Sequence, residues 1–447
     1  ERIHYTLKFD ELIKKIEYIS YKKQNDSEVK DITNNSKNMK GIDTFVAIKG
    51  NVLDGHKYID DAINKGAKTI VHSEDIDYAE GINYIKVADS RKATSDISNI
   101  LEDFPSKKMT VVGVTGTNGK TTTSSLIYFL IKEIYGKATN IGTDGAFVNG
   151  VRTETPNTTP DIFFINKVLN ESLDQGIDKS VIEASSHGLA QNRLNGIDFD
   201  YGVFTNLSTE HLDYHKTMDG YFDAKMKLFE VAKVKIANFD DSYGRKAKER
   251  FADVISYGTS NDADYMAYDI KKNDGKTTFF VKDQEFTINT IADYELYNAL
   301  AAITVLSQMG NDLGTIAENL VKFKGIPSRF QYIENDLGKN IVIDFAHTPV
   351  AFDSLFKSIP KDVRTYAVFG VNGDRNEEFR RLTGNICAKN DVFVVATTDD
   401  NKFDTFENIT NDLIKGIEEF GGDYERIENR KEAIKWAISH ANEGDFI

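Results

Sequence analysis

Residues 111–125 read Val-Val-Gly-Val-Thr-Gly-Thr-Asn-Gly-Lys-Thr-Thr-Thr-Ser-Ser, and this stretch decides the fold. A β-branched apolar run enters a glycine-rich turn, and an apolar helical pattern follows over 126–134. Glycines let the backbone approach an anion closely, and the N–H groups at a helix start point toward it. Lys120 adds a positive charge for the outer phosphates, and the Thr121 hydroxyl can reach Mg²⁺. The order therefore predicts a phosphate-binding loop and ATP chemistry.

The loop is shorter than the common phosphate-loop pattern. Val114 stands where that pattern needs its first glycine, which leaves Gly116-x-x-Gly119-Lys120-Thr121. The alternative is an ordinary strand–turn–helix joint with a surface lysine. Strand, turn, Lys-Thr and helix all follow in the right order, and this favours the phosphate loop.

Composition restricts the class of protein. Of 447 residues, 40% are hydrophobic and 28% are charged, as in a soluble globular protein, and no run of about 18 apolar residues predicts a membrane span. The net charge of −15 argues against nucleic acid or an anionic membrane as the partner. The single cysteine, Cys387, excludes an internal disulfide framework, and the first residues do not read as a signal peptide. We expect a cytoplasmic monomer.

The chain reads as three α/β blocks, which we predict as domains over 1–106, 107–335 and 336–447. The first block has strand patterns at 44–48 and 69–71, helical patterns at 58–65 and 91–102, and a linker at 105–108. The second alternates strands (111–114, 180–183, 201–205, 234–238) with helices (121–134, 160–175, 219–231, 294–309). This alternation predicts a mostly parallel sheet with helices on both faces.

The third block alternates in the same way and predicts a doubly wound, Rossmann-like sheet. Its strands are expected at 341–345, 364–371 and 391–397, and its helices at 349–358, 377–388, 405–420 and 430–442. Residues 444–447 resemble the opening of another strand, and residue 1 is not Met. We therefore expect a natural chain that is longer at both ends.

Polar residues follow several of the predicted strands, where ligands bind in open α/β sheets. Glu183 ends the strand at 180–183, and a carboxylate beside a phosphate loop is a natural Mg²⁺ ligand. The bland alternative is a solvated loop glutamate. His211, Asp213 and His215 lie within five residues after the strand at 201–205 and suggest a metal and substrate edge. A zinc site is disfavoured because no cysteine completes it, and a polar surface loop is the alternative.

Lys225 falls on the apolar side of a predicted helix, four residues after Tyr221. A lysine is unusual there, and snorkelling along the surface is the ordinary explanation. In the third block, Asp344 and His347 follow one strand, and Arg380 lies beyond the end of another. These residues predict a second polar cleft at a domain interface.

Eight motifs together carry a family resemblance over nearly the whole chain. They are Gly116-Thr117-Asn118-Gly119-Lys120-Thr121; Asn157-Thr158-Thr159-Pro160; Glu183-Ala184-Ser185-Ser186-His187; Thr205-Asn206-Leu207 through His215; Ala224-Lys225 with Leu228-Phe229; Tyr297-Asn298-Ala299; Asp344 to Pro349; and Gly373-Asp374-Arg375. With these motifs the chain resembles the Mur ligase superfamily, and within it the MurE type. The resemblance implies a three-domain fold with a UDP-binding first domain, a central ATP-binding domain and a Rossmann-like domain for the amino acid.

The resemblance also implies a reaction. Members of this type add the third amino acid to UDP-N-acetylmuramoyl-L-alanyl-D-glutamate during peptidoglycan synthesis. ATP phosphorylates the D-Glu γ-carboxylate, the free amino acid's amine attacks the acyl phosphate, and amide, ADP and phosphate result. The site must align anions and neutralise charge on the transferring phosphoryl group.

Roles for individual residues follow from the same resemblance. Lys120, His211 and Lys225 are the expected catalytic residues, and Mg²⁺ is expected at Thr121, Glu183, His211 and Lys225 as a carbamate. The other expected contacts are with ATP (Gly116, Thr117, Asn118, Gly119, Lys120, Thr121, Thr122, Asn298, Arg329, Asp344, His347), with the UDP-muramoyl substrate (Ser36, Asn157, Thr158, Thr159, Ser185, Gln191, Arg193) and with the amino acid (Arg380, Asp399, Asp400, Lys402).

The chain departs from the family pattern at three places. Asn35-Ser36-Lys37 replaces Asp-Ser-Arg near the uridine site, and Ser328-Arg329 replaces Gly-Arg. The Asp-Asn-Pro-Arg motif of diaminopimelate-adding members aligns with residues 399–402, Asp-Asp-Asn-Lys. Lys402 keeps a positive charge but lacks the bidentate fork of arginine. The third amino acid is therefore open between L-lysine, diaminopimelate or another.

Three alternative functions remain. One is another Mur-type ligase such as folylpolyglutamate synthase, against which residues 45–50 and Asp54-Gly55-His56 favour a UDP-linked acceptor. A second is a MurE-like paralogue that joins another amine to another carboxylate. The third is a regulatory ATPase without ligation, which would leave Lys225 and the third block without a role.

Overall fold

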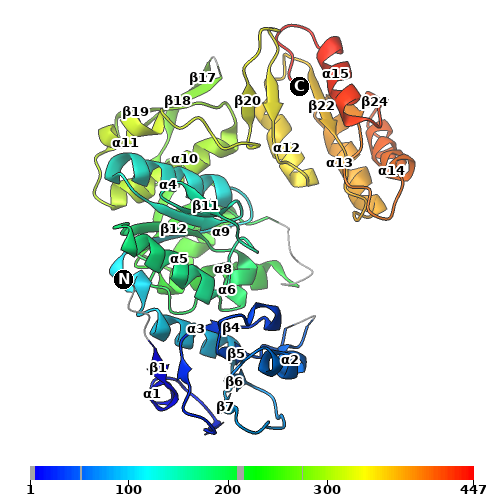
Figure 1. Cartoon of the computed structure of the whole chain (residues 1–447). Helices are drawn as coiled ribbons and strands as arrows, with labels where there is room; N and C mark the ends of the chain where they lie inside the picture. The colour runs from blue at the N-terminus through cyan, green and yellow to red at the C-terminus, as the bar shows by residue number, and fades with distance from the viewer. Residues whose placement is uncertain (1–5, 51–52, 209–215, 274) are drawn as a thin grey trace. The chain divides into compact units, whose positions relative to one another are not determined.

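The computed structural model describes residues 6–50, 53–208, 216–273 and 275–447, and Figure 1 traces them along the chain. The chain divides into two compact units. The first contains Glu1–Tyr268, Phe280–Gln284 and Tyr297–Leu320, and the second contains Asp269–Phe279, Glu285–Leu296 and Val321–Ile447. The strands β17 (Tyr268–Asn273), β18 (Lys276–Val281) and β19 (Gln284–Ile288) form a three-stranded sheet in this order.

The N-terminal part of the first unit is a five-stranded sheet in the order β2-β7-β6-β5-β4. Its strands are β2 (Ser20–Lys22), β4 (Ile32–Thr33), β5 (Thr44–Val46), β6 (Thr69–His72) and β7 (Asn83–Lys86), and β1 (Leu7–Lys8) pairs with β3 (Glu28–Val29). Alternate side chains enter two cores, with Val46 on the face of α1 (Phe9–Ile13) and α3 (Ser90–Leu101) and Phe45 on that of α2 (Ile59–Asn64). This is the two-residue period of a strand that is covered on both faces.

The central sheet of the first unit has nine strands in the order β11-β10-β9-β12-β8-β13-β14-β15-β16. The bounds are β8 (Thr110–Thr115), β9 (Thr139–Gly142), β10 (Gly145–Val148), β11 (Val151–Thr153), β12 (Lys179–Glu183), β13 (Tyr201–Phe204), β14 (Val234–Asn238), β15 (Ile255–Gly258) and β16 (Tyr265–Met266). All neighbours pair in parallel except β10 and β11, which extend β9 as an antiparallel hairpin. The prediction of a mostly parallel central sheet is confirmed.

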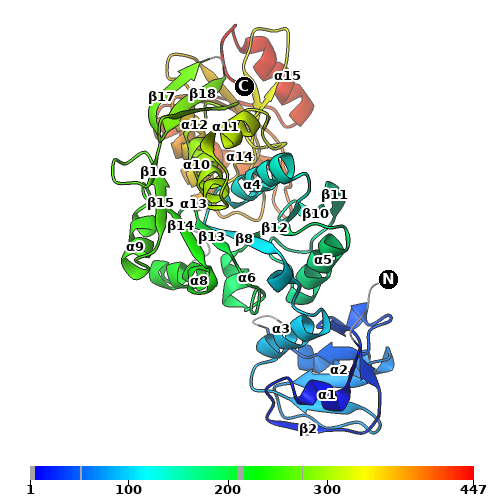
Figure 2. The ribbon, with the colours of Figure 1, turned by 90° about the vertical axis from the view of Figure 1, so that its left-hand side faces the viewer.

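Helices cover both faces of this sheet. Figures 1 and 2 show α4 (Lys120–Tyr135), α10 (Asp293–Gln308) and α11 (Leu313–Leu320) on one face, and α5 (Ile162–Asp174), α6 (Ser186–Ala190) and α8 (Met218–Val231) on the other. The helix α9 (Ser242–Arg250) contacts β14. A glycine stands at each end of α4. Gly119 and Gly136 have φ of 83° and 86°, and the Gly136 N–H donates to the Lys132 carbonyl. Left-handed glycine ends a helix in this way.

The second unit contains a parallel sheet of β22 (Thr365–Phe369), β23 (Val392–Ala396) and β24 (Tyr424–Arg426), and an antiparallel pair of β20 (Gln331–Ile333) and β21 (Ile341–Ile343). Its helices are α12 (Pro349–Ser358), α13 (Glu377–Lys389), α14 (Phe406–Glu418) and α15 (Arg430–His440). Val394 packs in the core with α13 and α14, while Val395 packs with α15 on the other face. The predicted doubly wound arrangement is confirmed.

The last residues of the chain behave as an opening strand, as the sequence predicted. Phe446 forms parallel bridges to Asn340 and Thr365. Its N–H donates to the Arg364 carbonyl at 2.9 Å, and its carbonyl accepts from the Tyr366 N–H at 2.8 Å. The segment therefore fills the place between β21 and β22.

The predicted linker at 105–108 is not an open connection. It forms a short 3-10 helix, Pro105–Lys108, in which Pro105 and Ser106 are buried. The Ser106 hydroxyl accepts from the Asp198 N–H at 3.1 Å, so the segment packs against the central part. No helix in the described part of the chain is long and apolar enough to cross a membrane.

Candidate active site

The loop between β8 and α4 has the close packing that a phosphate-binding loop needs. Gly116 and Gly119 have φ of 150° and 83°, in the region that favours glycine. A Cβ on Gly116 would lie 1.8 Å from the Thr205 hydroxyl oxygen, and one on Gly119 would lie 2.5 Å from the Asn298 side-chain oxygen. Both glycines are therefore required for this backbone path.

Two residues that follow β13 fasten the loop. The Thr205 hydroxyl donates to the Asn118 carbonyl at 2.7 Å. The Asn206 amide accepts from the Asn118 N–H at 2.9 Å and donates to its carbonyl at 3.0 Å. The Thr117 N–H donates to the Asn206 carbonyl at 2.9 Å. The Thr-Asn pair of the predicted motif thus fixes the loop's shape.

Lys120 and Asn298 both lie at this loop. The Lys120 ammonium donates to the carbonyls of Gly116 and Thr117, each at 2.9 Å. Asn298 is buried on α10 and accepts from the Thr123 hydroxyl at 3.1 Å. The structure therefore brings together the predicted ATP residues of the first unit, which are Gly116, Thr117, Asn118, Gly119, Lys120, Thr121, Thr122 and Asn298.

Glu183 is the last residue of β12 and is 1% exposed, which rules out a solvated loop residue. Its carboxylate accepts from the Thr121 hydroxyl and from both the N–H and the hydroxyl of Thr143, each at 3.1 Å. Burial raises the pKa of Glu183, and the charge of Lys120 and the Thr143 and Thr121 hydrogen bonds oppose that rise. Carboxylate and hydroxyl oxygens beside a phosphate loop are the donors that Mg²⁺ prefers.

The remaining predicted metal ligands are only partly described. His211, with Asp213 and His215, lies in 209–215, outside the described residues. Among the residues that the structure describes, no group of three or more His, Cys, Asp or Glu side chains is placed to hold a metal ion.

Lys225 points from α8 into the phosphate loop. Its side chain is 1% exposed, and its Nζ donates to the Gly116 carbonyl at 2.7 Å. The same Nζ lies 4.6 Å from the centre of the Tyr221 ring. The snorkelling alternative is wrong because the amine is turned inward and not toward solvent.

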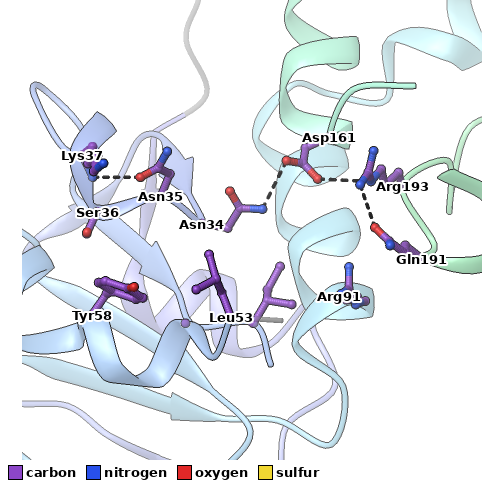
Figure 3. Close-up of a pocket in the computed structure, with 12 residues that line it drawn as sticks. Asn34, Asn35, Ser36, Lys37, Leu53, Tyr58, Arg91, Asp161, Gln191 and Arg193 are labelled. Carbon is purple, nitrogen blue, oxygen red and sulfur yellow. Dashed lines mark hydrogen bonds and ion pairs between the residues drawn. The ribbon is translucent and has the colours of Figure 1, made fainter. Parts of the chain in front are cut away.

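A pocket of about 540 Å³ lies next to the central part of the first unit (Figure 3). Ser36, Gln191 and Arg193 of the predicted substrate set line it, with Asn34, Asn35, Lys37, Ile48, Leu53, Gly55, Tyr58, Arg91 and Asp161. The Arg193 guanidinium donates to the Gln191 side chain at 2.7 Å and to the Thr159 carbonyl at 2.8 Å. The lining contains three cationic side chains, Lys37, Arg91 and Arg193, and one acidic side chain, Asp161. This pocket therefore favours an anion, although the whole chain is acidic.

Four other predicted substrate residues do not line this pocket, and three of them, Thr158, Thr159 and Ser185, lie near Glu183. The Thr159 hydroxyl donates to the Glu183 carbonyl at 2.6 Å and accepts from the Ser185 N–H at 2.8 Å. Thr158 and Thr143 have hydroxyl oxygens 3.0 Å apart. Asn157 is exposed. The predicted substrate set is thus divided between the pocket and the surroundings of Glu183, with Asn157 on the surface.

In the second unit, Arg329, Asp344 and His347 gather near Phe345. The Asp344 carboxylate accepts from the N–H groups of Phe330 and Ala346, both at 2.8 Å. Arg329 stacks over the Phe345 ring at 4.6 Å, and a His347 ring nitrogen lies 3.0 Å from the Phe345 carbonyl. Asp344 therefore ties two loop segments together and leaves Arg329 and His347 beside an exposed aromatic ring.

Arg380, on α13, is buried between two acids. Its guanidinium pairs with Asp404 at 2.7 Å and with Asp412 at 3.0 Å, and it donates to the Gly373 carbonyl at 2.9 Å. Its Nε is buried and has no hydrogen-bond partner among the described residues. A hydrogen bond from the Thr405 N–H and the contact with Arg380 lower the pKa of Asp404. Arg380 is the residue predicted to bind the carboxylate of the amino acid. Its positive charge is already balanced here by Asp404 and Asp412.

The other predicted amino-acid residues are paired as well. Lys402 lies 2.6 Å from the Asp400 carboxylate, which raises the pKa of Lys402. Asp399 lies 4.0 Å from Arg430. All three follow β23, at its carboxyl end, so they belong to one loop.

Comparison with known proteins assigns the chain to a family. It is 35% identical to the UDP-N-acetylmuramoyl-L-alanyl-D-glutamate--2,6-diaminopimelate ligase of Clostridium perfringens over 98% of this chain and 92% of that protein. The protein of the same name from Clostridioides difficile is 33% identical over 99% and 93%. The chain belongs to the Mur ligase family. The family's catalytic, middle and glutamate ligase domains match residues 28–101, 114–306 and 328–447.

Solved structures agree with this assignment. A structure of a UDP-N-acetylmuramoyl-L-alanyl-D-glutamate--2,6-diaminopimelate ligase has a TM-score of 0.72 at 28% identity, over 99% of this chain and 92% of that one. MurF of Thermotoga maritima in complex with ADP has a TM-score of 0.63 at 22% identity, over 93% and 92%. The Mur ligase fold, with its parallel-rich central sheet, is therefore shown.

Sequence reasoning missed three residues of this candidate site. Asn34 and Arg91 line the pocket, and Thr143 donates two hydrogen bonds to Glu183. Arg91 had a local signal, because Asp89 caps the start of α3 and places Arg91 in its first turn. No local sequence signal indicates the role of Thr143, because its partners Thr158 and Glu183 are distant from it in the sequence.

Proposed function

We propose that this Mur ligase adds an amino acid to UDP-N-acetylmuramoyl-L-alanyl-D-glutamate in peptidoglycan synthesis, with ATP as the phosphoryl donor. The fastened phosphate loop, with Lys120 over its carbonyls and Glu183 buried beside it, carries this proposal. The relatives named for the same acceptor match nearly the whole chain. The three cations of the pocket suit the diphosphate of a UDP-linked acceptor. We place the enzyme in the cytoplasm and propose that it acts as a monomer.

In the proposed reaction the D-Glu γ-carboxylate oxygen attacks the γ-phosphorus of ATP, and ADP leaves. The free amine then attacks the acyl carbon, loses a proton and expels phosphate. Lys120 and the loop N–H groups hold the phosphates and offset their negative charge. Glu183, Thr121, His211 and Lys225 are the residues that would hold Mg²⁺, which supplies further charge neutralisation when bound. Arg329, Asp344 and His347 are proposed for the nucleotide.

We propose that Lys225 is carbamylated. In that reaction the Lys225 ammonium first loses a proton. The neutral amine then attacks carbon dioxide, forms a nitrogen–carbon bond and releases a second proton, so a cation becomes a carboxylate. The burial of Lys225 and its position at the Gly116 carbonyl support the proposal. A carboxylate there would add hard oxygen atoms, which Mg²⁺ prefers, at the phosphate loop.

ADP release measured with ATP, the UDP-linked dipeptide and an amino acid tests the function. Release should require the acceptor and the amino acid together. Release with ATP alone would favour a regulatory ATPase, and release with a different carboxylate acceptor would favour a paralogue. A folate acceptor would favour folylpolyglutamate synthase.

Replacing Arg91 with alanine should raise the KM for the UDP-linked acceptor about tenfold, with a small change in kcat. A hydrogen bond to a charged group contributes about 1.5–3 kcal/mol, and Arg91 lines the pocket. Lys92→Ala is the matched control, because this neighbouring lysine of α3 pairs with Asp96 instead. Equal KM values for the two variants would remove Arg91 from the acceptor site.

We propose that the third amino acid carries a second ionisable end and is diaminopimelate or L-lysine. Relatives named as diaminopimelate ligases support the first. Arg380 is proposed for the α-carboxylate, and the loop of Asp399, Asp400 and Lys402 for the distal end. Lys402 acts there as a point charge, with poorer shape selection than arginine.

Lys402→Ala should therefore reduce kcat/KM for diaminopimelate more than for L-lysine, because only the former has a second carboxylate. Competition between the two amino acids in one reaction measures the change directly. Lys415→Ala, an exposed lysine of α14 that pairs with Glu377, is the control. If only neutral or acidic amino acids support ADP release, the proposed distal site is wrong.

A further inference from the structure

The turn after β9 holds the buried carboxylate of Glu183 from one side. We propose that Thr143, in this turn, is a positioning residue that fixes the orientation of Glu183 for the metal and links it to the acceptor-side residue Thr158. The inference rests on the proposed function, because it takes Glu183 as the carboxylate that binds the metal of a metal–nucleotide complex.

Thr143 contacts both oxygens of one carboxylate. Its N–H donates to Glu183 Oε1 and its hydroxyl to Glu183 Oε2, each at 3.1 Å. The two residues are neighbours because β9 and β12 pair in parallel, with Ile141 opposite Ile182. Two bonds from one residue stop the carboxylate from rotating, so its orientation is set before any ligand arrives.

Gly142 makes room for this arrangement. A Cβ at this position would lie 2.1 Å from Glu183 Oε1 and 2.6 Å from its carboxyl carbon. Real Cβ atoms do not approach this closely, so any larger residue would displace the carboxylate. Gly142 therefore provides the space and Thr143 the two donors. Since Thr143 itself is exposed, its hydroxyl has no role in filling the core.

The Thr143 hydroxyl also reaches the acceptor side. Its oxygen lies 3.0 Å from that of Thr158, in the segment before α5. A hydroxyl has one hydrogen, and an ionised carboxylate only accepts, so Thr143 donates to Glu183 and accepts from Thr158. Two hydrogen bonds thus connect Thr158 with Glu183, and a substrate group that takes the Thr158 hydrogen changes the first of them.

The test compares Thr143→Val, which removes the hydroxyl, with Thr143→Ser, which keeps it. Titration of Mn²⁺ in the presence of ADP, followed by electron paramagnetic resonance, measures metal affinity without turnover. Thr143→Val should raise the Mn²⁺ Kd about tenfold, as loss of a contact that supports a metal ligand does. Thr143→Ser, which keeps the hydroxyl, should have the Kd of the wild type. Thr153→Val, an exposed threonine of β11, is the control and should bind as the wild type does.

Gly142→Ala is an independent second variant and should weaken Mn²⁺ binding as well, because its Cβ displaces Glu183. Equal Mn²⁺ affinity in Thr143→Val, Gly142→Ala and wild type would overturn the positioning role and leave the proposed function standing. A wild-type enzyme that binds no Mn²⁺ with ADP would overturn the proposed metal–nucleotide site itself. Loss of affinity in Thr143→Ser equal to that in valine would also count against the hydroxyl.

Discussion

Replacing Lys120 with alanine is expected to reduce ligation at least about a hundredfold and to leave the fold intact. The Lys120 ammonium lies over the carbonyls of Gly116 and Thr117, where the phosphates of a bound nucleotide would take its hydrogen bonds. Its side chain is only partly buried and belongs to none of the hydrophobic cores. The variant should therefore lose activity because the charge of the transferring phosphoryl group is no longer neutralised. The stability of the fold should not change.

Lys132→Ala is the matched control, because Lys132 stands in the last turn of the same helix, α4. Steady-state ADP release and thermal unfolding should be measured on both variants. We expect similar unfolding temperatures, with activity lost only in Lys120→Ala. Activity of Lys120→Ala within about threefold of wild type would contradict the role, since removal of one such donor typically costs much more.

The phosphate loop could be predicted because its signal is contiguous. The β-branched run, Gly116, Gly119 and Lys120 lie within ten residues, and local rules for strands, turns and helix starts apply to them directly. Helical spacing from Tyr221 also predicts that Lys225 lies on the apolar face of its helix. The burial of Lys225 confirms this prediction. Helical periodicity reports which face is buried, although not what the buried group touches.

The rest of the site depends on contacts between segments that are far apart in the sequence. Glu183 owes its environment to Thr121 on α4 and to Thr143 after β9. The strands β9 to β11 have only three or four residues each, and β9 and β10 contain glycines, so the sequence has no run of alternating residues that predicts them. Arg380 is another example, because its pairing with Asp404 and Asp412 brings a loop and α14 to α13.

Replacing Lys225 with alanine is expected to abolish most ligation, by about a hundredfold or more, as for other preorganised charges beside a transferring phosphoryl group. The Lys225 Nζ lies 2.7 Å from the Gly116 carbonyl and is shielded by Tyr221. If the amine is carbamylated, alanine removes a carboxylate next to the loop and leaves a small cavity. Lys227→Ala, an exposed lysine two residues along α8, should retain full activity.

Chemical rescue separates a carbamate from a plain ammonium. Acetate or formate can enter the space that alanine leaves and supply the missing carboxylate, so either acid should restore part of the lost rate in Lys225→Ala and none in Lys120→Ala. Labelled bicarbonate should give a carbamate carbon signal by nuclear magnetic resonance in wild type and not in Lys225→Ala. A fully active alanine variant would remove Lys225 from the mechanism. An inactive variant that methylammonium restores, and acetate does not, would show that the positive charge is what the site uses.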